Sequence, residues 1–510
     1  MINMDNSKIL VGAIIVGIMA FPCVSEAQYR RKADEPIKTQ AQQMLEQADS
    51  LETPMLISLD QALEIALSEN VSVKVADKEI EKTGYARKGT YAALFPQIDI
   101  SGNYQRTIKK QVMYMDIDMG ALGGPGGMAP GGDGSSSGES TQDDASASPM
   151  SGGLEVGRWN TWSAGVTAAM PIINAQLWKS IKISSKNIEL AVEKARASRL
   201  DMVTQVKQAY FAALLSKEAF NVYKEVYENA VRNLEEAQKK YNAQKASELE
   251  LTRAKTTVAN AVPDVYNAES SVILALWQLK AVMGVDLDAN IDIDGVLEDW
   301  SETMFYDIHQ HDSVTLDNNS VMRQLAIQAE QMAETIKLRN YAYIPTLSAA
   351  FSFSVNAMTN DFKFSQYKWT PYSYVGVSLS IPVFSGLKRY NDVRQAKASY
   401  QQLQLQTKDT ERQLKIAIRQ SLNAMETNMK SYYAAKEAVE TAQKGYDIAE
   451  KSYQLGRGTL LELNDAQLAL TQARLGASQA IYNFIVAKAQ LEQTIGADFI
   501  SEQDNMQNVK

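Results

Sequence analysis

Four short stretches of the chain alternate apolar and polar residues, the pattern of β-strands with one apolar face. They fall into two pairs and predict strands at about 97–113 and 159–170, then at about 346–358 and 372–381. In the first stretch, the apolar positions are Ile98, Ile100, Tyr104 and Ile108. Each half of the chain therefore contributes two strands that need an apolar surrounding on one side.

Each strand pair is followed by a region in which apolar residues recur at steps of three and four, the coiled-coil period. These regions predict two long helical hairpins, over 172–283 and 383–495. A helix from Ile172 to Asn242 would be about 100 Å long at a rise of ~1.5 Å per residue. It carries a second apolar seam on another face. Two seams suit a helix in the wall of a tube, with neighbours on both sides, although a solid antiparallel bundle fits them equally well.

The second half of the chain repeats the first. The strand-to-helix region around Gly165 matches the region around Gly376, and the sequences after the long helices match as well. We expect residues 58–285 to form a first structural repeat and 321–496 a second, joined by a connecting segment at 286–320. One unit of strand, strand, long helix, turn and helix has been used twice, which predicts a mainly α fold with internal pseudo-symmetry.

The remaining segments differ in composition from the repeats. Residues 1–27 have the basic start, apolar run and small residues of a secretory signal peptide. Cys23, the only cysteine, lies in this segment without the small residues that precede a lipid-anchor cysteine, so we expect no lipid. Residues 28–57 predict an N-terminal periplasmic segment, and 497–510 a C-terminal tail. Residues 116–157 are rich in Gly, Ser and Met and predict an extracellular loop inserted at a hairpin tip.

Composition excludes several classes of function. The net charge of −9 argues against a nucleic-acid partner. The only histidines, His309 and His311, lie two apart on a polar segment without a defined ligand geometry, so we expect no metal site. A calcium-loop-like run from Asn290 has Ser301 where the motif needs glutamate. We find no catalytic constellation and no cofactor motif, and expect the protein not to be an enzyme.

The strands point to a membrane. A lone hairpin is only marginally stable in water, and strands of about a dozen residues suit a tilted crossing of a bilayer. Four strands are too few to enclose a pore, so we expect several chains to share one barrel, whose closure removes the unpaired strand edges.

The chain resembles the TolC family of outer-membrane efflux proteins. The resemblance covers nearly all of residues 58–496 and is carried by the duplicated unit, the junctions AAMPIINAQLWKS and LSIPVFSGLKR, and the turn YQLGRGTLLELNDAQ. It implies a homotrimer in which four strands per chain build a 12-stranded β-barrel in the outer-membrane lipid. The helices would continue as a periplasmic α-helical tunnel, with 286–320 in an equatorial belt.

By the same resemblance, the protein would be a passive exit duct of a tripartite efflux or type I secretion system. Its partners would be a periplasmic adaptor (membrane-fusion) protein and an inner-membrane pump, which supplies the energy. The alternative is a periplasmic coiled-coil adaptor or scaffold without a pore. Such a protein would be expected to carry one helical hairpin and a lipoyl-like β-domain, whereas this chain carries two hairpins and four strands with apolar faces.

The resemblance also places the turns between the long helices at the periplasmic tip of the tunnel. Acidic residues at matching positions face the closed aperture, which makes Glu462 and Asp465 candidates, with Glu250 and Arg253 at the corresponding places in the first repeat. Arg253 and Asp465 could form an ion pair or remain separate solvated charges. Our candidates for adaptor docking at the tip are Tyr453, Leu455, Gly456, Thr459, Tyr241, Ala243 and Ser247.

Overall fold

The computed structural model describes residues 54–113, 154–302, 304 and 315–497. The predicted signal peptide, most of 28–57, nearly all of the loop at 116–157, both histidines and all but the first residue of the predicted tail lie outside these ranges. The chain forms two compact units. Unit 1 draws on Met1–Glu81, Leu190–Ala326 and Leu405–Lys510, and unit 2 on Lys82–Glu189 and Ile327–Gln404. Both repeats contribute to both units.

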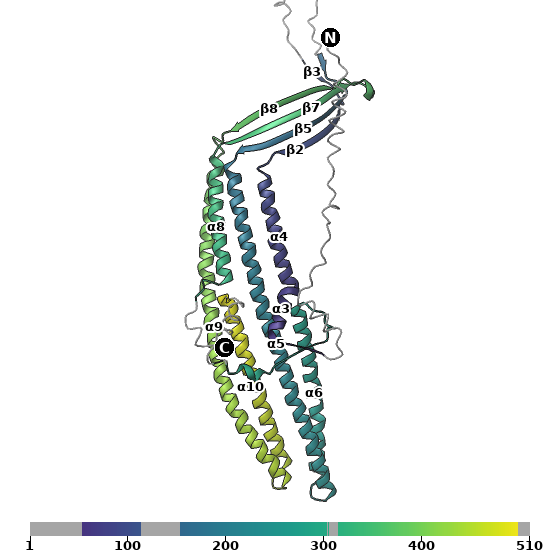
Figure 1. Cartoon of the computed structure of the whole chain (residues 1–510), viewed down its shortest axis with the longest axis vertical. Coiled ribbons are helices and arrows are strands. Elements are labelled where there is room, and N and C mark those ends of the chain that lie inside the picture. The colour runs from purple at the N-terminus through teal and green to yellow at the C-terminus, as the bar shows by residue number, and fades with distance from the viewer. Residues whose placement is uncertain (1–53, 114–153, 303, 305–314, 498–510) are drawn as a thin grey trace, which may run out of the picture. The chain divides into compact units, whose positions relative to one another are not determined.

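Unit 2 contains a four-stranded antiparallel sheet (Figure 1). Its strands are β2 (Gln97–Arg106), β5 (Asn160–Ile173), β7 (Thr346–Thr359) and β8 (Thr370–Ser380), in the order β2-β5-β7-β8. Two short strands, β3 (Gln111–Met113) and β4 (Leu154–Val156), pair separately. The central pair, β5 with β7, therefore joins the two sequence repeats, and each outer strand belongs to a different repeat.

The register aligns the apolar positions of all four strands on one face. Ile100 lies opposite Val166, Val166 opposite Phe353, and the neighbouring Phe351 opposite Val375. Because directly paired residues point to the same side of a sheet, the separate apolar patterns of the sequence combine into one continuous surface. The described residues leave this surface uncovered, since Ile100 is 66% and Val375 78% exposed.

The first strand is shorter than predicted. Pairing of β2 with β5 ends at Arg106 opposite Asn160, and the chain breaks from the sheet before β3 begins at Gln111. Ile108, predicted to lie on the apolar face, falls in this break and is 94% exposed. The alternation of apolar residues continues past the point where the partner strand ends, so the pattern alone overestimates the strand.

The long helices begin later than predicted at both junctions. In the first repeat, β5 runs on to Ile173 and α5 (Ala175–Asn242) starts three residues after the expected position, with the Asn174 side chain accepting a hydrogen bond from the Leu177 amide. In the second, α9 (Lys388–Gln454) starts five residues late. There, Gly386 and Leu387 have positive φ angles of 58° and 64°, which a right-handed helix excludes.

The other helices complete the two repeats. Each long helix turns into a return helix, α6 (Glu248–Met283) after α5 and α10 (Leu460–Ile495) after α9. The helices preceding the sheet are α3 (Leu59–Glu69) and α4 (Val71–Ala92) in the first repeat and α8 (Ser320–Asn340) in the second. With 68 residues, α5 is about 100 Å long. No helix in the described ranges is both long and apolar enough to cross a membrane.

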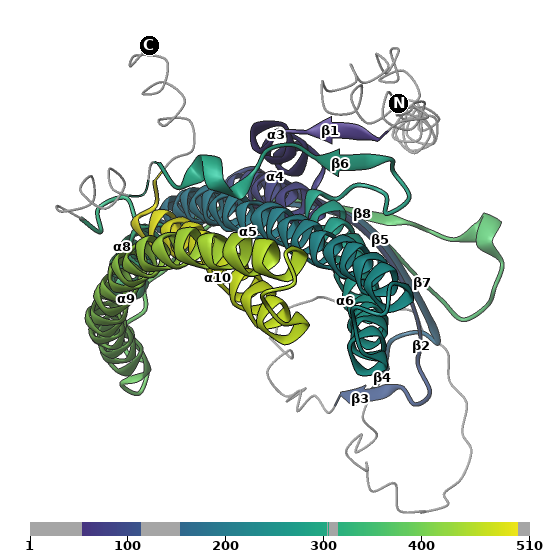
Figure 2. The ribbon, with the colours of Figure 1, turned by 90° about the horizontal axis from the view of Figure 1, so that it is seen from below.

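Unit 1 has its main core where the connecting segment meets the helices. β1 (Met55–Ile57) pairs in parallel with β6 (Ile291–Ile293), and the short helix η3 (Leu297–Trp300) follows. β1 and β6 lie side by side next to α3 (Figure 2). The Tyr210 hydroxyl of α5 donates a hydrogen bond to the Asp294 carbonyl at 2.6 Å. The described residues of the predicted connecting segment from Ile291 to Trp300 are thus packed in unit 1, and they pair with the strand that directly precedes the first repeat.

Two further 3-10 turns border the sheet. η4 (Tyr341–Tyr343) links α8 to β7, and η5 (Phe364–Gln366) lies between β7 and β8. Near η5, Phe364 packs edge-to-face against Trp162 with ring centroids 4.8 Å apart, and the ring centroids of Trp162 and Tyr104 are 4.2 Å apart. Aromatic side chains therefore cluster at one end of the sheet.

Two repeat-related glycines allow a test of how tightly the central strand pair is packed. A Cβ atom at Gly165 would lie 2.9 Å from the Phe353 carbonyl oxygen of β7, whereas one at Gly376 meets only the Tyr374 ring at 3.8 Å.

We predict that Gly165→Ala forces β5 from β7 and destabilises the protein by about 1–3 kcal/mol. The matched change Gly376→Ala should cost much less. Thermal unfolding of the sheet, followed by circular dichroism, compares the two; equal loss of stability in both variants would contradict the prediction.

Candidate functional site at the tip of the helical hairpins

The turn of the second repeat is closed by glycine. After α9 ends, Gly456 adopts a left-handed conformation with φ 72°, and the Arg457 amide donates to the Ser452 carbonyl at 2.9 Å. The Gly458 amide donates to the same carbonyl at 3.0 Å. This is the αL ending typical of helices that stop at glycine. It reverses the chain within five residues and brings α10 back beside α9.

A capping box fixes the start of α10. The Thr459 hydroxyl accepts a hydrogen bond from the Glu462 amide at 3.2 Å, and the Glu462 carboxylate accepts one from the Thr459 amide at 2.9 Å. Both bonds satisfy amides that the helix cannot pair internally. Glu462, an aperture candidate, is therefore also a structural part of the turn.

The turn of the first repeat reaches the same geometry without glycine. Gln244, in the place of Gly456, has φ 56°, and the Lys245 amide donates to the Lys240 carbonyl at 2.8 Å. A left-handed conformation costs a residue with a side chain roughly 1–2 kcal/mol. Ser247 then caps α6 by accepting from the Glu250 amide at 3.2 Å. The two turns are alike in shape and differ in the strain that they carry.

Tyr453 joins the two turns. Its side chain is only 2% exposed and belongs to an apolar cluster with Ala237, Ala254, Leu460 and Leu463. The members come from all four long helices, so the cluster forms a small core at the tip. Tyr453 is therefore an internal residue of the tip and does not present its side chain to a docking partner in this arrangement.

Lys240, a residue that the sequence analysis did not single out, completes this link. Its ammonium group lies 3.7 Å from the centre of the Tyr453 ring and donates a hydrogen bond to the Tyr453 carbonyl at 2.5 Å. A cation over an aromatic face is attracted by the ring quadrupole. The two residues are 213 positions apart in the chain, so no local pattern could have indicated their contact.

The Tyr453 hydroxyl is buried and makes no hydrogen bond of normal geometry with the described residues. Burial, together with the nearby Glu250 carboxylate, raises its pKa. The hydroxyl is thus protonated at neutral pH and faces a carboxylate without a regular bond between them.

The remaining aperture candidates are exposed. Asp465 and Arg253 both lie at the surface, and no ion pair joins them within the described part of the chain. Close to both in sequence, the Asn464 side-chain amide of α10 donates a hydrogen bond to the Thr257 hydroxyl of α6 at 3.2 Å. The two return helices are thus held by a neutral contact, which leaves the charges of Arg253 and Asp465 at the surface.

The docking candidates other than Tyr453 are all exposed at the two turns. Leu455 is the most exposed apolar residue there at 72%, and Tyr241 is 39% exposed. Gly456, Ala243, Thr459 and Ser247 form the backbone framework of the turns. Leu455 and Tyr241 therefore offer the apolar side chains that another protein could cover.

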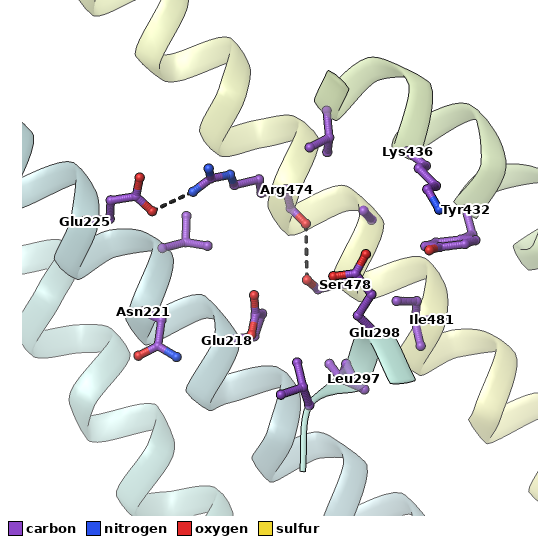
Figure 3. A pocket seen from close by; sticks show the side chains of 14 residues that line it. Glu218, Asn221, Glu225, Leu297, Glu298, Tyr432, Lys436, Arg474, Ser478 and Ile481 are labelled. Carbon is purple, nitrogen blue, oxygen red and sulfur yellow. Dashed lines mark hydrogen bonds and ion pairs between the residues drawn. The ribbon is translucent and has the colours of Figure 1, made fainter. Parts of the chain in front are cut away.

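Away from the tip, unit 1 contains a hollow (Figure 3). It has a volume of about 250 Å³ and lies between α5, α9, α10 and the residues of η3. Arg474 pairs with Glu225 across it at 2.6 Å, and Glu218, Glu298 and Lys436 add further charges. The lining combines opposite charges without a nucleophile paired to a base. Within the described ranges, no group of three or more His, Cys, Asp or Glu side chains could hold a metal ion.

Comparison with known proteins agrees with this arrangement. "Outer membrane protein TolC" of Vibrio cholerae is 21% identical over 351 residues, covering 68% of this chain and 78% of the relative. "Proteases secretion protein PrtF" of Dickeya chrysanthemi is 22% identical over 369 residues, covering 68% and 75%. These relatives share two thirds of the chain at low identity.

Solved structures show the same fold. The CmeC outer membrane channel of Campylobacter jejuni superposes with a TM-score of 0.64 at 17% identity, covering 88% of each chain. The open state of the MtrE outer membrane channel of Neisseria gonorrhoeae gives 0.59 at 17% identity, covering 86% of this chain and 88% of that one. The outer membrane efflux protein family matches residues 62–285 and 313–497, well over half of the sequence. The chain belongs to the outer membrane efflux protein family.

Proposed function

We propose that the protein is the outer-membrane exit duct of a tripartite efflux or type I secretion system. It would conduct substrates passively, after an inner-membrane pump and a periplasmic adaptor deliver them. The observation that carries this proposal is the union, in one chain of this family, of a sheet with an uncovered apolar face and two long helical hairpins. An adaptor or scaffold without a pore gives no reason for the apolar sheet.

The sheet would be closed by other copies of the chain. Among the described residues, its outer strands β2 and β8 each have one neighbouring strand, which leaves a row of backbone amides and carbonyls without a strand partner on both edges. Lipid offers these groups no hydrogen bonds, so an open edge in a membrane is costly. Pairing of β2 in one copy with β8 in the next satisfies them. Three copies would give the 12-stranded barrel that the family resemblance implies.

The helical hairpins would form the tunnel wall in the periplasm. Both hairpins end in turns that share one small core around Tyr453, so each chain contributes a single rigid tip. In a trimer, three such tips would surround the narrowest point. We propose that Glu462 and Asp465 line it, with Glu250 and Arg253 nearby, and that the resulting acidic ring favours cations and binds divalent ions.

The capping box allows the charges of the tip to be removed without disturbing the fold of the turn. Glutamine at position 462 keeps the oxygen that the capping box requires, so Glu462→Gln with Asp465→Asn removes two charges while leaving the turn intact. We expect pores of this variant in planar bilayers to show weaker cation selectivity and weaker block by divalent cations. Glu437→Gln with Glu440→Gln removes the same charge from exposed positions on α9, more than three turns from Gln454, and should leave both properties unchanged.

Two results would count against these assignments. Unchanged selectivity and block in the tip variant would place the constriction elsewhere while leaving the duct in place. Complete absence of conductance from the reconstituted wild-type protein, with or without its partners, would contradict the duct itself.

For the adaptor, we propose docking on the exposed turns through Leu455 and Tyr241. Leu455→Asp should abolish binding of the adaptor, because it removes the most exposed apolar side chain of the tip and adds a charge. Gln454→Asp adds the same charge one residue away, also at an exposed position, and should retain most of the binding. Co-purification of the adaptor with each variant measures the difference. Full binding by the Leu455 variant would show that the adaptor docks elsewhere.

A further inference from the structure

The helical segments next to the sheet carry an unusual charge. We call residues 82–92, 175–189, 327–340 and 388–404, the helical part of unit 2, the collar. The collar contains twelve Lys and Arg against four Asp and Glu, in a chain whose net charge is −9. The four strands of the sheet contain only Asp99 and Arg106 as charged residues. A nearly uncharged sheet is thus followed directly by a strongly basic zone.

The acidic residues of the collar are already paired within it. Glu334 is buried between three lysines, with Lys179 at 2.9 Å and Lys182 and Lys337 at 3.0 Å. Burial alone would raise the pKa of Glu334, but the hydrogen bonds from these lysines outweigh it and lower the pKa to about 2.

The other three carboxylates are paired as well. Glu189 and Glu330 both contact Lys186, at 2.6 and 2.7 Å, and Asp392 contacts Lys388 at 3.1 Å. No collar carboxylate is left to balance the remaining basic residues. The collar therefore keeps a net charge of +8 after its internal pairs are formed.

Basic side chains of the collar also lie over tyrosine rings. Lys88 is 5.1 Å from the Tyr85 ring centre, and Arg394 is 5.2 Å from that of Tyr390. Similar contacts join Arg87 to Tyr91, Lys179 to Tyr341 and Arg389 to Tyr343. Tyrosine is enriched where a membrane meets water, because its ring is apolar and its hydroxyl polar. Five cation–tyrosine contacts in one zone match that environment.

The collar lies against apolar side chains that the chain leaves uncovered. At the end of β8, Val383 is 89% and Phe384 81% exposed, and Trp178 in the first turns of α5 is 59% exposed. Arg389 follows closely and donates to the Pro382 carbonyl at 2.8 Å, which fixes a cation at this junction. From the sheet into the collar, the side chains thus change from apolar to aromatic and then to positively charged. Lipid presents the complementary order of acyl chain, interface and anionic phosphate.

We propose that the collar binds the headgroups of anionic phospholipids in the membrane leaflet that adjoins the helices. Phosphate diesters with apolar chains, such as phosphatidylglycerol, complement both its charge and its apolar border, and basic residues near a membrane surface attract such lipids. The inference rests on placement of the sheet in the membrane and does not depend on conduction through a pore.

The test compares two variants that lose the same charge. Lys88→Gln, Lys388→Gln and Arg394→Gln together neutralise three exposed collar residues. Lys415→Gln, Lys430→Gln and Lys444→Gln neutralise three exposed residues of α9 in unit 1. Binding of fluorescent phosphatidylglycerol and of phosphatidylcholine with the same acyl chains is titrated for each purified full-length protein in neutral detergent.

We expect the wild-type protein and the unit 1 variant to prefer phosphatidylglycerol, with an affinity that falls as salt is raised. The collar variant should bind phosphatidylglycerol at least about tenfold more weakly and phosphatidylcholine unchanged. Equal affinity of the wild type for the two lipids, or an equal loss in both variants, would overturn the proposal. Conductance of the collar variant in planar bilayers, measured alongside, separates loss of lipid binding from loss of the duct.

Discussion

The unpaired backbone at the two edges of the sheet is the constraint on which the rest of the structure depends. A strand in lipid must have a neighbour on both sides, and in the described part of one chain only β5 and β7 have both. The continuous apolar face is stable in contact with lipid, while the open edges of β2 and β8 need further strands as hydrogen-bond partners. Under the proposed assembly, association of identical chains would meet both needs at once, and it would bring the helices that follow each strand pair into a common ring. Among the described residues of one chain, the duplicated sequence thus provides two fully paired strands and two strands with an open edge.

The two repeats share a fold but differ where function is proposed. In the second repeat, Gly456 and the box of Thr459 with Glu462 give an unstrained turn. In the first, Gln244 holds the same shape under strain, and Lys240 reaches across to Tyr453. Each chain would therefore present two unlike turns, locked together by one buried tyrosine. An opening of the aperture would have to move this core as a unit or break it.

Much of this architecture could be predicted from periodicity, because strand alternation and helical seams report directly which side of an element is apolar. The pairing of β5 with β7, which places Val166 opposite Phe353, was not predicted from the sequence and is seen only in the structure. The start of α9 differs from the prediction because a positive φ at Leu387 delays the helix, and a hydrophobic pattern carries no information about φ. The spacing of Thr459 and Glu462 signals a capping box in the sequence itself. Burial of Tyr453 depends on contacts from distant helices and required the structure.

Disulfide trapping of the sheet edges tests the central claim most directly. Within one chain, β2 and β8 are separated by two strands, about 14 Å at the usual spacing, too far for a disulfide. Cysteine at Ser101 is combined in turn with cysteines from Tyr372 to Ser380, with Cys23 replaced. The account predicts that at least one pair links separate chains into a covalent species of three subunits on a denaturing gel. Absence of intermolecular links throughout the scan, or a closed species of two chains, would contradict it.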